Sequence, residues 1–217
     1  SGEIIDCKSD VNFTLTETDD IKPIGGLVGK LDVDGLGNGL LKSCVFNGSI
    51  IDNRTKLDHE SLVGSIAGWN KSEIKNCINK GSVKVKNAEF VGGITGLHEG
   101  EMIKCINKGK IKAERTIGGL IGETSESSHV NKSWNLGSVE GTSKEQTGGL
   151  IGSLNGSISK SYAHATIKPQ SEEMLFGTVK DQSTVKNVHI LPVNTHQQTI
   201  HGIRSDIEPE ELKTLLI

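Results

Sequence analysis

The sequence predicts an all-β protein, a parallel β-helix (β-solenoid) of about seven coils, and three observations support this fold class. A glycine-rich segment of five residues recurs along the chain. A block with a fixed spacing of apolar residues follows each copy. The apolar stretches are short, and they lack the i, i+3, i+4 spacing of an amphipathic helix. Glycine is accordingly frequent, with 27 among 217 residues.

The glycine-rich segment is well preserved in the middle of the chain, where residues 92–96 read GGITG. Glycine inside a strand marks a tight bend or a close approach of two backbones. A glycine pair at one corner of every coil is consistent with both. Further copies lie at 25–29, 64–68, 118–122 and 148–152, and a degenerate copy lies at 175–179.

The second block aligns one position of every repeat, which we call the cysteine column. Seven coils with two insertions in the early loops account for its intervals of 37, 33, 28, 28, 28 and 27 residues. A single unit cannot bury an apolar face, whereas units stacked at the strand spacing of roughly 4.8 Å bury it continuously. The cysteine column comprises Cys7, Cys44, Cys77, Cys105, Ser133, Ser161 and Val188.

The spacing inside the block leaves one question open. Ile74 and Cys77 are three residues apart, so a straight strand cannot turn both side chains inward. Either a bend or a bulge lies between them, or one of the two faces outward. The turns at 79–81 and 107–109 read Asn-Lys-Gly, and they place residues that tolerate the left-handed conformation where the chain turns again.

We expect one solenoid domain over residues 1–203, followed over 204–217 by a short capping helix or the start of the next segment. Residues 205–211 resemble a helix start, with acids and an early proline. Leucines at 212, 215 and 216 would form an apolar face suited to cover the last coil. We expect the chain to be a piece of a longer protein.

The middle coils, residues 63–83, 91–111 and 117–139, resemble the GLUG repeat, named for its Gly-Leu-variable-Gly signature. The resemblance extends from residue 24 to about residue 193. It implies a right-handed β-helix-like module of secreted or wall-anchored bacterial proteins. Such proteins include adhesin-like proteins and the streptococcal immunoglobulin A1 protease family of zinc metallopeptidases, which carry similar repeats in their N-terminal region. The repeats are not known as catalytic elements, so the resemblance implies no chemistry.

Charge and hydropathy exclude several classes of partner. A net charge of −3 and a pI near 6.2 argue against a nucleic-acid-binding protein. No run of 18 apolar residues occurs, so we expect no direct membrane insertion. With the resemblance, these features predict a secreted or cell-surface bacterial protein that is monomeric within its longer chain.

The cysteines and histidines do not form a recognisable catalytic or metal site. The cysteines lack the spacing of metal ligands, and their replacement by serine and valine favours reduced, structural thiols over disulfides. His59-Glu60 and His98-Glu99 begin like a zincin motif, but the second histidine is missing, so we expect both in surface loops. We therefore expect no catalytic residue, no metal and no cofactor.

Lysines form the pattern that predicts a binding site. Lys104, Lys132 and Lys160 occupy the same position in three successive coils, and further lysines, Lys110 among them, lie nearby. Stacked lysines repel one another modestly, and together they attract a polyanion. The alternative is that they are solvated and discourage edge-to-edge aggregation. The candidate site for an anionic ligand comprises Lys75, Lys80, Lys84, Lys104, Lys108, Lys112, Lys132 and Lys160.

The expected function is that of a non-catalytic structural or recognition module of a larger extracellular bacterial protein. It would space or present other domains and bind a host protein, an anionic glycan or a wall polymer. One alternative is the substrate-recruiting N-terminal region of an immunoglobulin A-cleaving zinc metalloprotease. A second is a carbohydrate-active β-helix enzyme, which is disfavoured because no column stacks carboxylates or mixes acids with bases.

Overall fold

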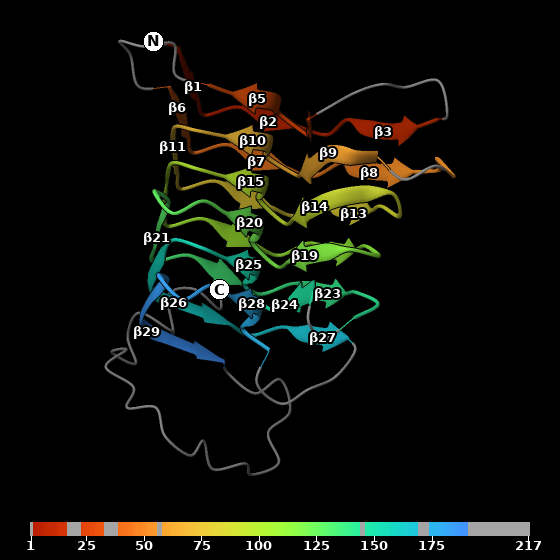
Figure 1. The fold of residues 1–217 in the computed structure, drawn as a ribbon. Coiled ribbons are helices and arrows are strands. Elements are labelled where there is room, and N and C mark those ends of the chain that lie inside the picture. Colours follow the sequence, from red (N-terminus) through yellow and green to blue (C-terminus); the bar gives the residue numbers. More distant parts are fainter. Residues whose placement is uncertain are drawn as a thin grey trace.

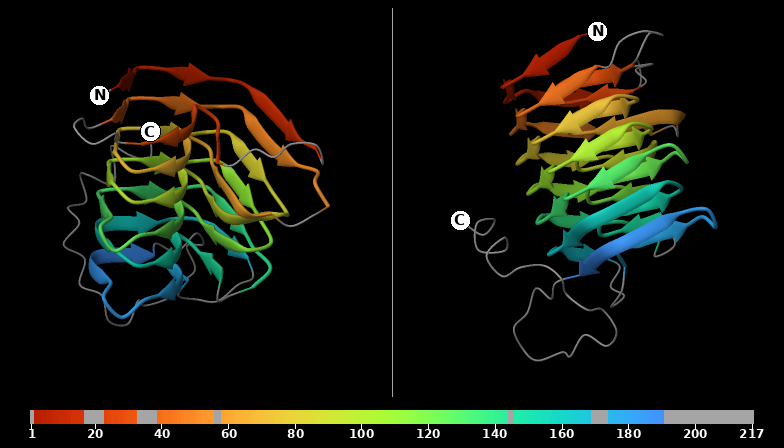
Figure 2. Two further views of the ribbon diagram at one scale, coloured as in Figure 1. Left: turned by 45° about the horizontal axis from the view of Figure 1, so that its top comes forward. Right: turned by 90° about the vertical axis from the view of Figure 1, so that its left-hand side faces the viewer.

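The computed structural model describes residues 2–16, 23–32, 39–55, 58–143, 146–168 and 174–190, with 58–60 as backbone alone. The chain winds through successive coils, and each strand pairs in parallel with the equivalent strand of the next coil (Figure 1). Figure 2 shows these coils stacked along one axis. The predicted parallel β-helix is confirmed. The expected capping helix at 204–217 lies outside the described residues.

The largest sheet has twelve strands, which come from two short segments of each coil. The first segment forms β1 (Glu3–Ile5), β6 (Leu40–Lys42), β11 (Glu73–Lys75), β16 (Glu101–Ile103) and β21 (His129–Asn131). The second segment forms β2 (Lys8–Ser9), β7 (Val45–Phe46), β12 (Ile78–Asn79), β17 (Ile106–Asn107) and β22 (Trp134–Asn135). Both segments merge in β26 (Ser157–Ala163) and β29 (Thr184–Ile190).

Three further sheets complete the wall of the solenoid. The next sheet along the coil contains β3 (Asn12–Leu15), β8 (Ser49–Asp52), β13 (Ser82–Lys84), β18 (Lys110–Lys112), β23 (Ser138–Glu140) and β27 (Thr166–Lys168). A five-stranded sheet contains β4 (Ile24–Gly25), β9 (Asp58–Gly64), β14 (Ala88–Gly92), β19 (Thr116–Gly118) and β24 (Thr147–Gly148). The last sheet contains β5 (Val28–Leu31), β10 (Ala67–Asn70), β15 (Thr95–His98), β20 (Ile121–Thr124), β25 (Ile151–Leu154) and β28 (Phe176–Val179).

The pairing register agrees with the alignment of the repeats. Ile74 lies beside Met102, and Ser161 lies beside Val188 of the cysteine column. Equivalent residues therefore lie over one another along the axis. One inward column of fully or almost fully buried side chains comprises Leu41, Ile74, Met102, Val130 and Ile158.

A residue in the left-handed conformation separates Ile74 from Cys77. Asn76 has a φ of 55°, and the bend that it makes turns both neighbouring side chains inward, each with 0% exposure. A bend, rather than an outward-facing side chain, thus answers the question that the spacing left open. The same conformation recurs in every coil, and we call its residues the bend column: Asp6, Ser43, Asn76, Lys104, Lys132, Lys160 and Asn187.

A ladder of buried asparagines supports the next corner of the coil. Asn79 Nδ2 donates to Asn107 Oδ1 at 2.7 Å, and Asn107 Nδ2 donates to Asn135 Oδ1 at 2.8 Å. Asn135 Nδ2 ends the ladder on the carbonyl oxygen of Gly149 at 2.7 Å. Each amide oxygen also accepts the backbone N–H two residues later. The ladder therefore satisfies buried amides and fixes the Asn-Lys-Gly turns.

Candidate functional site

The lysines of the predicted site lie in several columns of the outer surface. Three belong to the bend column, two lie in the Asn-Lys-Gly turns, and three lie at the ends of strands. The bend column holds Lys104, Lys132 and Lys160, the turns hold Lys80 and Lys108, and the strand ends hold Lys75 (β11), Lys84 (β13) and Lys112 (β18).

Two of these lysines are ion-paired. Lys75 Nζ lies 3.7 Å from Glu73 Oε1, and Lys112 Nζ hydrogen-bonds Glu140 Oε1. That hydrogen bond lowers the pKa of Glu140. The other six lysines form no ion pair with a described residue. Their charges are therefore available to an external ligand.

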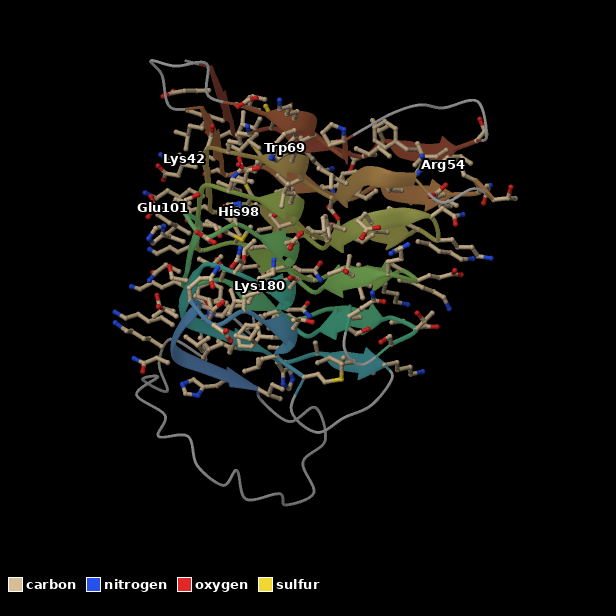
Figure 3. The ribbon with its side chains drawn as sticks, in the orientation of Figure 1. Lys42, Arg54, Trp69, His98, Glu101 and Lys180 are labelled. Carbon is tan, nitrogen blue, oxygen red and sulfur yellow. The ribbon has the colours of Figure 1, made fainter. Side chains whose placement is uncertain are left out.

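Acids and bases are mixed around the first segment of the large sheet. Lys42 and Glu101, at the ends of β6 and β16, project outward on this side of the solenoid (Figure 3). Lys75 lies beside Lys42 in register and pairs with Glu73 of its own strand. Glu73 also lies beside Glu101, which lies beside His129, so one column stacks two carboxylates next to a histidine, and the expectation that no column does so is wrong. This part of the surface therefore lacks a uniform positive charge.

Lys80 and Lys108 instead line a groove with a volume of about 370 Å³, in which no lining residue is acidic. Lys110 lines it as well, and all three lysines are exposed. We call this feature the glycine-corner groove. It is lined by Asn12, Asn47, Gly48, Ser49, Lys80, Gly81, Ser82, Lys108, Gly109 and Lys110.

Glycines form the floor of the groove because the backbones of successive coils approach closely there. A Cβ on Gly81 would lie 2.2 Å from the carbonyl oxygen of Gly48, and one on Gly109 would lie 2.0 Å from that of Gly81. No side chain fits at such a distance. Since the floor carries no side chains, the residues before and after each glycine become the two walls.

The walls combine cations with neutral polar groups. Asn47, Lys80 and Lys108 come from the turns, and Ser49, Ser82 and Lys110 begin β8, β13 and β18. Ser49 Oγ donates to Asn12 Oδ1 at 2.8 Å, whereas the Ser82 hydroxyl has no partner among the described residues.

A carboxylate occupies the position in the first coil that Asn47, Lys80 and Lys108 occupy in the following coils. Asp10 accepts a hydrogen bond from Asn47 Nδ2 at 2.8 Å and pairs with Lys8 at 2.9 Å. The hydrogen bond from Asn47 and the neighbouring Lys8 lower the pKa of Asp10. Positive charge is therefore uncompensated only further along the groove, at Lys80, Lys108 and Lys110.

The bend column forms a second basic surface. Lys104, Lys132 and Lys160 have φ angles of 53°, 49° and 49°. Two residues further along the chain, Trp134 and Tyr162 are adjacent in register, and their ring centroids are 5.8 Å apart. Tyr162 is 3% exposed and Trp134 is half-buried, so the pair is not an open aromatic platform.

The ring face and the indole N–H of Trp69 are both occupied by contacts with neighbouring residues. Its ring lies 4.3 Å from Lys30 Nζ and 4.5 Å from Lys71 Nζ. Its indole N–H donates to Glu99 Oε1 at 2.6 Å, and Lys30 pairs with Asp32 at 2.6 Å. These contacts make a structural network rather than an open platform for a ligand.

His98 was expected in a surface loop, and this expectation is wrong. It ends β15 and is fully buried, with Nδ1 3.0 Å from Asn70 Nδ2 (Figure 3). Burial lowers the pKa of His98 to about 3. His59 lies within β9 rather than in a loop. In the described part of the chain, no three His, Cys, Asp or Glu side chains are arranged to hold a metal ion.

The predicted set missed part of the groove. It contains Lys80 and Lys108 but omits Lys110 and the polar residues between them. A sequence signal for these residues was present, because the glycines at 48, 81 and 109 each lie between two polar residues. The sequence does not state that this corner is concave.

Comparison with protein-family models, curated proteins and solved structures found no match to this chain. The GLUG resemblance therefore stays a sequence-based prediction. Within the described residues, no helix has the length and apolar character needed to cross a bilayer.

Proposed function

We propose that the chain is a non-catalytic recognition and spacing module that binds an anionic partner through lysines of its outer surface. One observation carries the proposal. Lys80, Lys108 and Lys110 share a groove that no carboxylate lines, and none of them is ion-paired with a described residue. Positive charge gathered in a concave surface concentrates the electric field and attracts anions.

The scaffold supports the spacing role. Each coil advances the axis by roughly 4.8 Å, and neighbouring coils hold equivalent side chains in register. A module of this kind can separate other domains by a set distance and present a regular surface. The proposal that the parent protein is bacterial and extracellular rests on the GLUG resemblance.

A binding role fits the groove better than a catalytic one. Glycoside hydrolysis uses a pair of carboxyl groups on either side of the bond that is broken. The lining residues of the groove are lysine, serine, asparagine and glycine. These side chains provide charge and hydrogen bonds for a ligand but no such pair.

Retention on a sulfated column, measured at low and high salt, tests the proposal. Wild type is expected to bind at low salt and elute as salt screens the lysines. The variant Lys80→Asn/Lys108→Asn/Lys110→Ser should elute earlier, because it loses three positive charges. It is expected to fold, because its three new residues occur naturally at equivalent positions of other coils. Lys104→Asn/Lys132→Asn/Lys160→Asn, which removes the same charge outside the groove, is the control. Equal retention of wild type at both salt concentrations would contradict the proposal.

A further inference from the structure

The glycine-corner groove runs along the solenoid axis. Its floor glycines, Gly48, Gly81 and Gly109, come from successive coils, and each carbonyl oxygen lies under the glycine of the next coil. Ser49, Ser82 and Lys110 are adjacent in register. A ligand that follows the floor must therefore cross the coils one after another.

The groove has defined ends. Gly137 extends the floor into a further coil, since a Cβ there would lie 1.9 Å from the carbonyl oxygen of Gly109. Val11 precedes Gly48 in the same column, and Ala165 follows Gly137. Both carry side chains, so the run of glycines spans four coils, or roughly 14 Å at the strand spacing, and its first three members line the groove. This length accommodates a short stretch of a linear polymer.

The walls combine charged with neutral hydrogen-bonding groups, and in one coil Lys108 and Lys110 are both charged. Lys80 stands with Ser82 in one coil, and Asn47 stands with Ser49 in the coil before it. Lysine ammonium groups attract anionic groups, whereas Ser82 Oγ and Asn47 Oδ1 can accept hydrogen bonds. A ligand that uses both kinds of group carries anionic groups together with hydroxyls, which donate those hydrogen bonds. Polyphosphate carries a charge on every unit and has no hydroxyl along its length. A single-stranded nucleic acid gains affinity by stacking its bases on aromatic rings, and no aromatic residue lines the groove.

We infer that the glycine-corner groove binds a linear acidic polysaccharide whose chain lies along the solenoid axis. Carboxylate or sulfate groups contact Lys80, Lys108 and Lys110, and sugar hydroxyls contact Ser82 and the amide of Asn47. This inference rests on the proposed function and specifies its ligand class and its site.

The bend column offers a matched control. Lys104, Lys132 and Lys160 also repeat once per coil, but none of them lines the glycine-corner groove. Replacing all three by asparagine removes as much charge as the groove variant does. Asn76 and Asn187 already adopt the required left-handed conformation, so this variant is expected to fold.

Calorimetric titration of the full chain tests the site. The probes are oligomers of polygalacturonate (carboxylate), dextran sulfate (sulfate), polyphosphate and neutral dextran. The groove variant Lys80→Asn/Lys108→Asn/Lys110→Ser is expected to bind the favoured acidic polysaccharide about 30-fold more weakly, and the bend-column variant less than about threefold more weakly. Comparing the carboxylated with the sulfated probe identifies the anionic group.

A gain of affinity tests the orientation. Leu136 occupies the place of Lys80 and Lys108 in the next coil, immediately before Gly137. Leu136→Lys lengthens the basic wall, so it should raise affinity about threefold or more for oligomers long enough to reach it, and not for shorter ones. Asn76→Lys adds the same charge to the bend column and should change the affinity for neither the longer nor the shorter oligomers.

The outcomes separate the inference from the proposed function. If acidic polysaccharides bind but the groove and bend-column variants weaken them equally, the ligand is not in the groove, and the inference is overturned while the proposed function stands. The same holds if polyphosphate binds as tightly as the polysaccharides. If wild type binds none of the anionic probes, both fail.

Discussion

At His98 the solenoid encloses an ionisable side chain in its interior. The ring lies between Asn70 and Thr124 in register, and Asn70 Nδ2 donates to its Nδ1. This hydrogen bond requires the neutral ring with its proton on Nε2. Burial lowers the pKa of His98 to about 3 and outweighs the backbone hydrogen bonds at Gly100 and His129, which raise it.

This burial predicts a loss of stability in acid. Unfolded His98 takes up a proton near pH 6.5, whereas the folded form remains neutral down to about pH 3. The unfolded state therefore binds more protons in this window, and stability falls as the pH decreases through it. At pH 4 the loss is about 3 kcal/mol. Urea unfolding between pH 7.5 and 4 measures it.

His98→Thr is the matched variant, since Thr124 occupies the next position of the same column. Its stability should depend less steeply on pH than that of wild type below pH 6.5, and equally above it. Parallel profiles for the two proteins would show that His98 does not carry the acid sensitivity. The sequence could not predict this burial, because its turn-rich surroundings resemble a loop.

A buried ion pair links the end of β8 to β9. Arg54 Nε lies 2.9 Å from Asp52 Oδ1, Nη2 lies 3.0 Å from Oδ2, and Nη2 also donates to Ser61 Oγ at 3.1 Å. The two charged residues are 6% and 4% exposed. Removing one partner leaves the other charge buried without compensation, so Arg54→Met should lower the free energy of unfolding by about 3–5 kcal/mol.

The double variant Asp52→Val/Arg54→Met is the companion measurement. Val85, the residue equivalent to Asp52 in the neighbouring coil, is already a buried valine. Because the double change removes both charges, chemical denaturation should show it to be more stable than Arg54→Met alone. A double variant as unstable as the single one would mean that lost packing, rather than an unpaired charge, sets the cost.

At the scale of the strands, the bend column decides how each coil is shaped. Lysine is an uncommon residue for the left-handed conformation, whereas asparagine tolerates it well. Lys104→Asn should therefore raise the free energy of unfolding by about 0.5–1 kcal/mol, and Asn76→Lys should lower it by a similar amount. Equilibrium urea unfolding checks both, and an unchanged midpoint for each would contradict the assigned role of the bend.

The spacing of Ile74 and Cys77 predicted either a bend or an outward side chain and left the choice open. Asn76, a residue that tolerates the left-handed conformation, was the signal that could have decided it. The lysines at 104, 132 and 160 obscured this signal, since they indicate charge rather than backbone conformation. The sequence thus located the strands well, but the same three residues were interpreted as a binding strip or as solvated lysines, and not as bends.

For the whole molecule, stacking of the coils depends on the floor of the groove. Gly109→Ala would place a methyl group 2.0 Å from the carbonyl oxygen of Gly81, so two coils would have to separate. We expect a loss of about 3 kcal/mol or more. Val11 begins the same column and is 50% exposed, so Val11→Gly should change stability by less than about 1 kcal/mol. Thermal unfolding measures both variants, and equal shifts of the two midpoint temperatures would contradict this role of the floor glycines.

The stack itself was predictable, because a repeat of constant length brings equivalent residues into register. Cys77 and Cys105, for example, follow β11 and β16, which pair as expected. The groove was not predictable, because its depth depends on how closely neighbouring turns approach. Lys110 illustrates this, since only the arrangement of the coils shows that it lines the same groove as Lys80 and Lys108.

The cysteines of the cysteine column are free, and burial raises the pKa of Cys44 to about 11 and that of Cys105 well above its usual range, whereas the hydrogen bond with Cys105 lowers the pKa of Cys77. Because thiolates, rather than thiols, react with oxidants and alkylating reagents, the Cys44 and Cys105 sulfurs should stay inert while the coils remain closed. Iodoacetamide labelling of Cys105 would then report how often the middle of the rod opens. Oxidation of Cys105 would therefore mark molecules whose coils have opened.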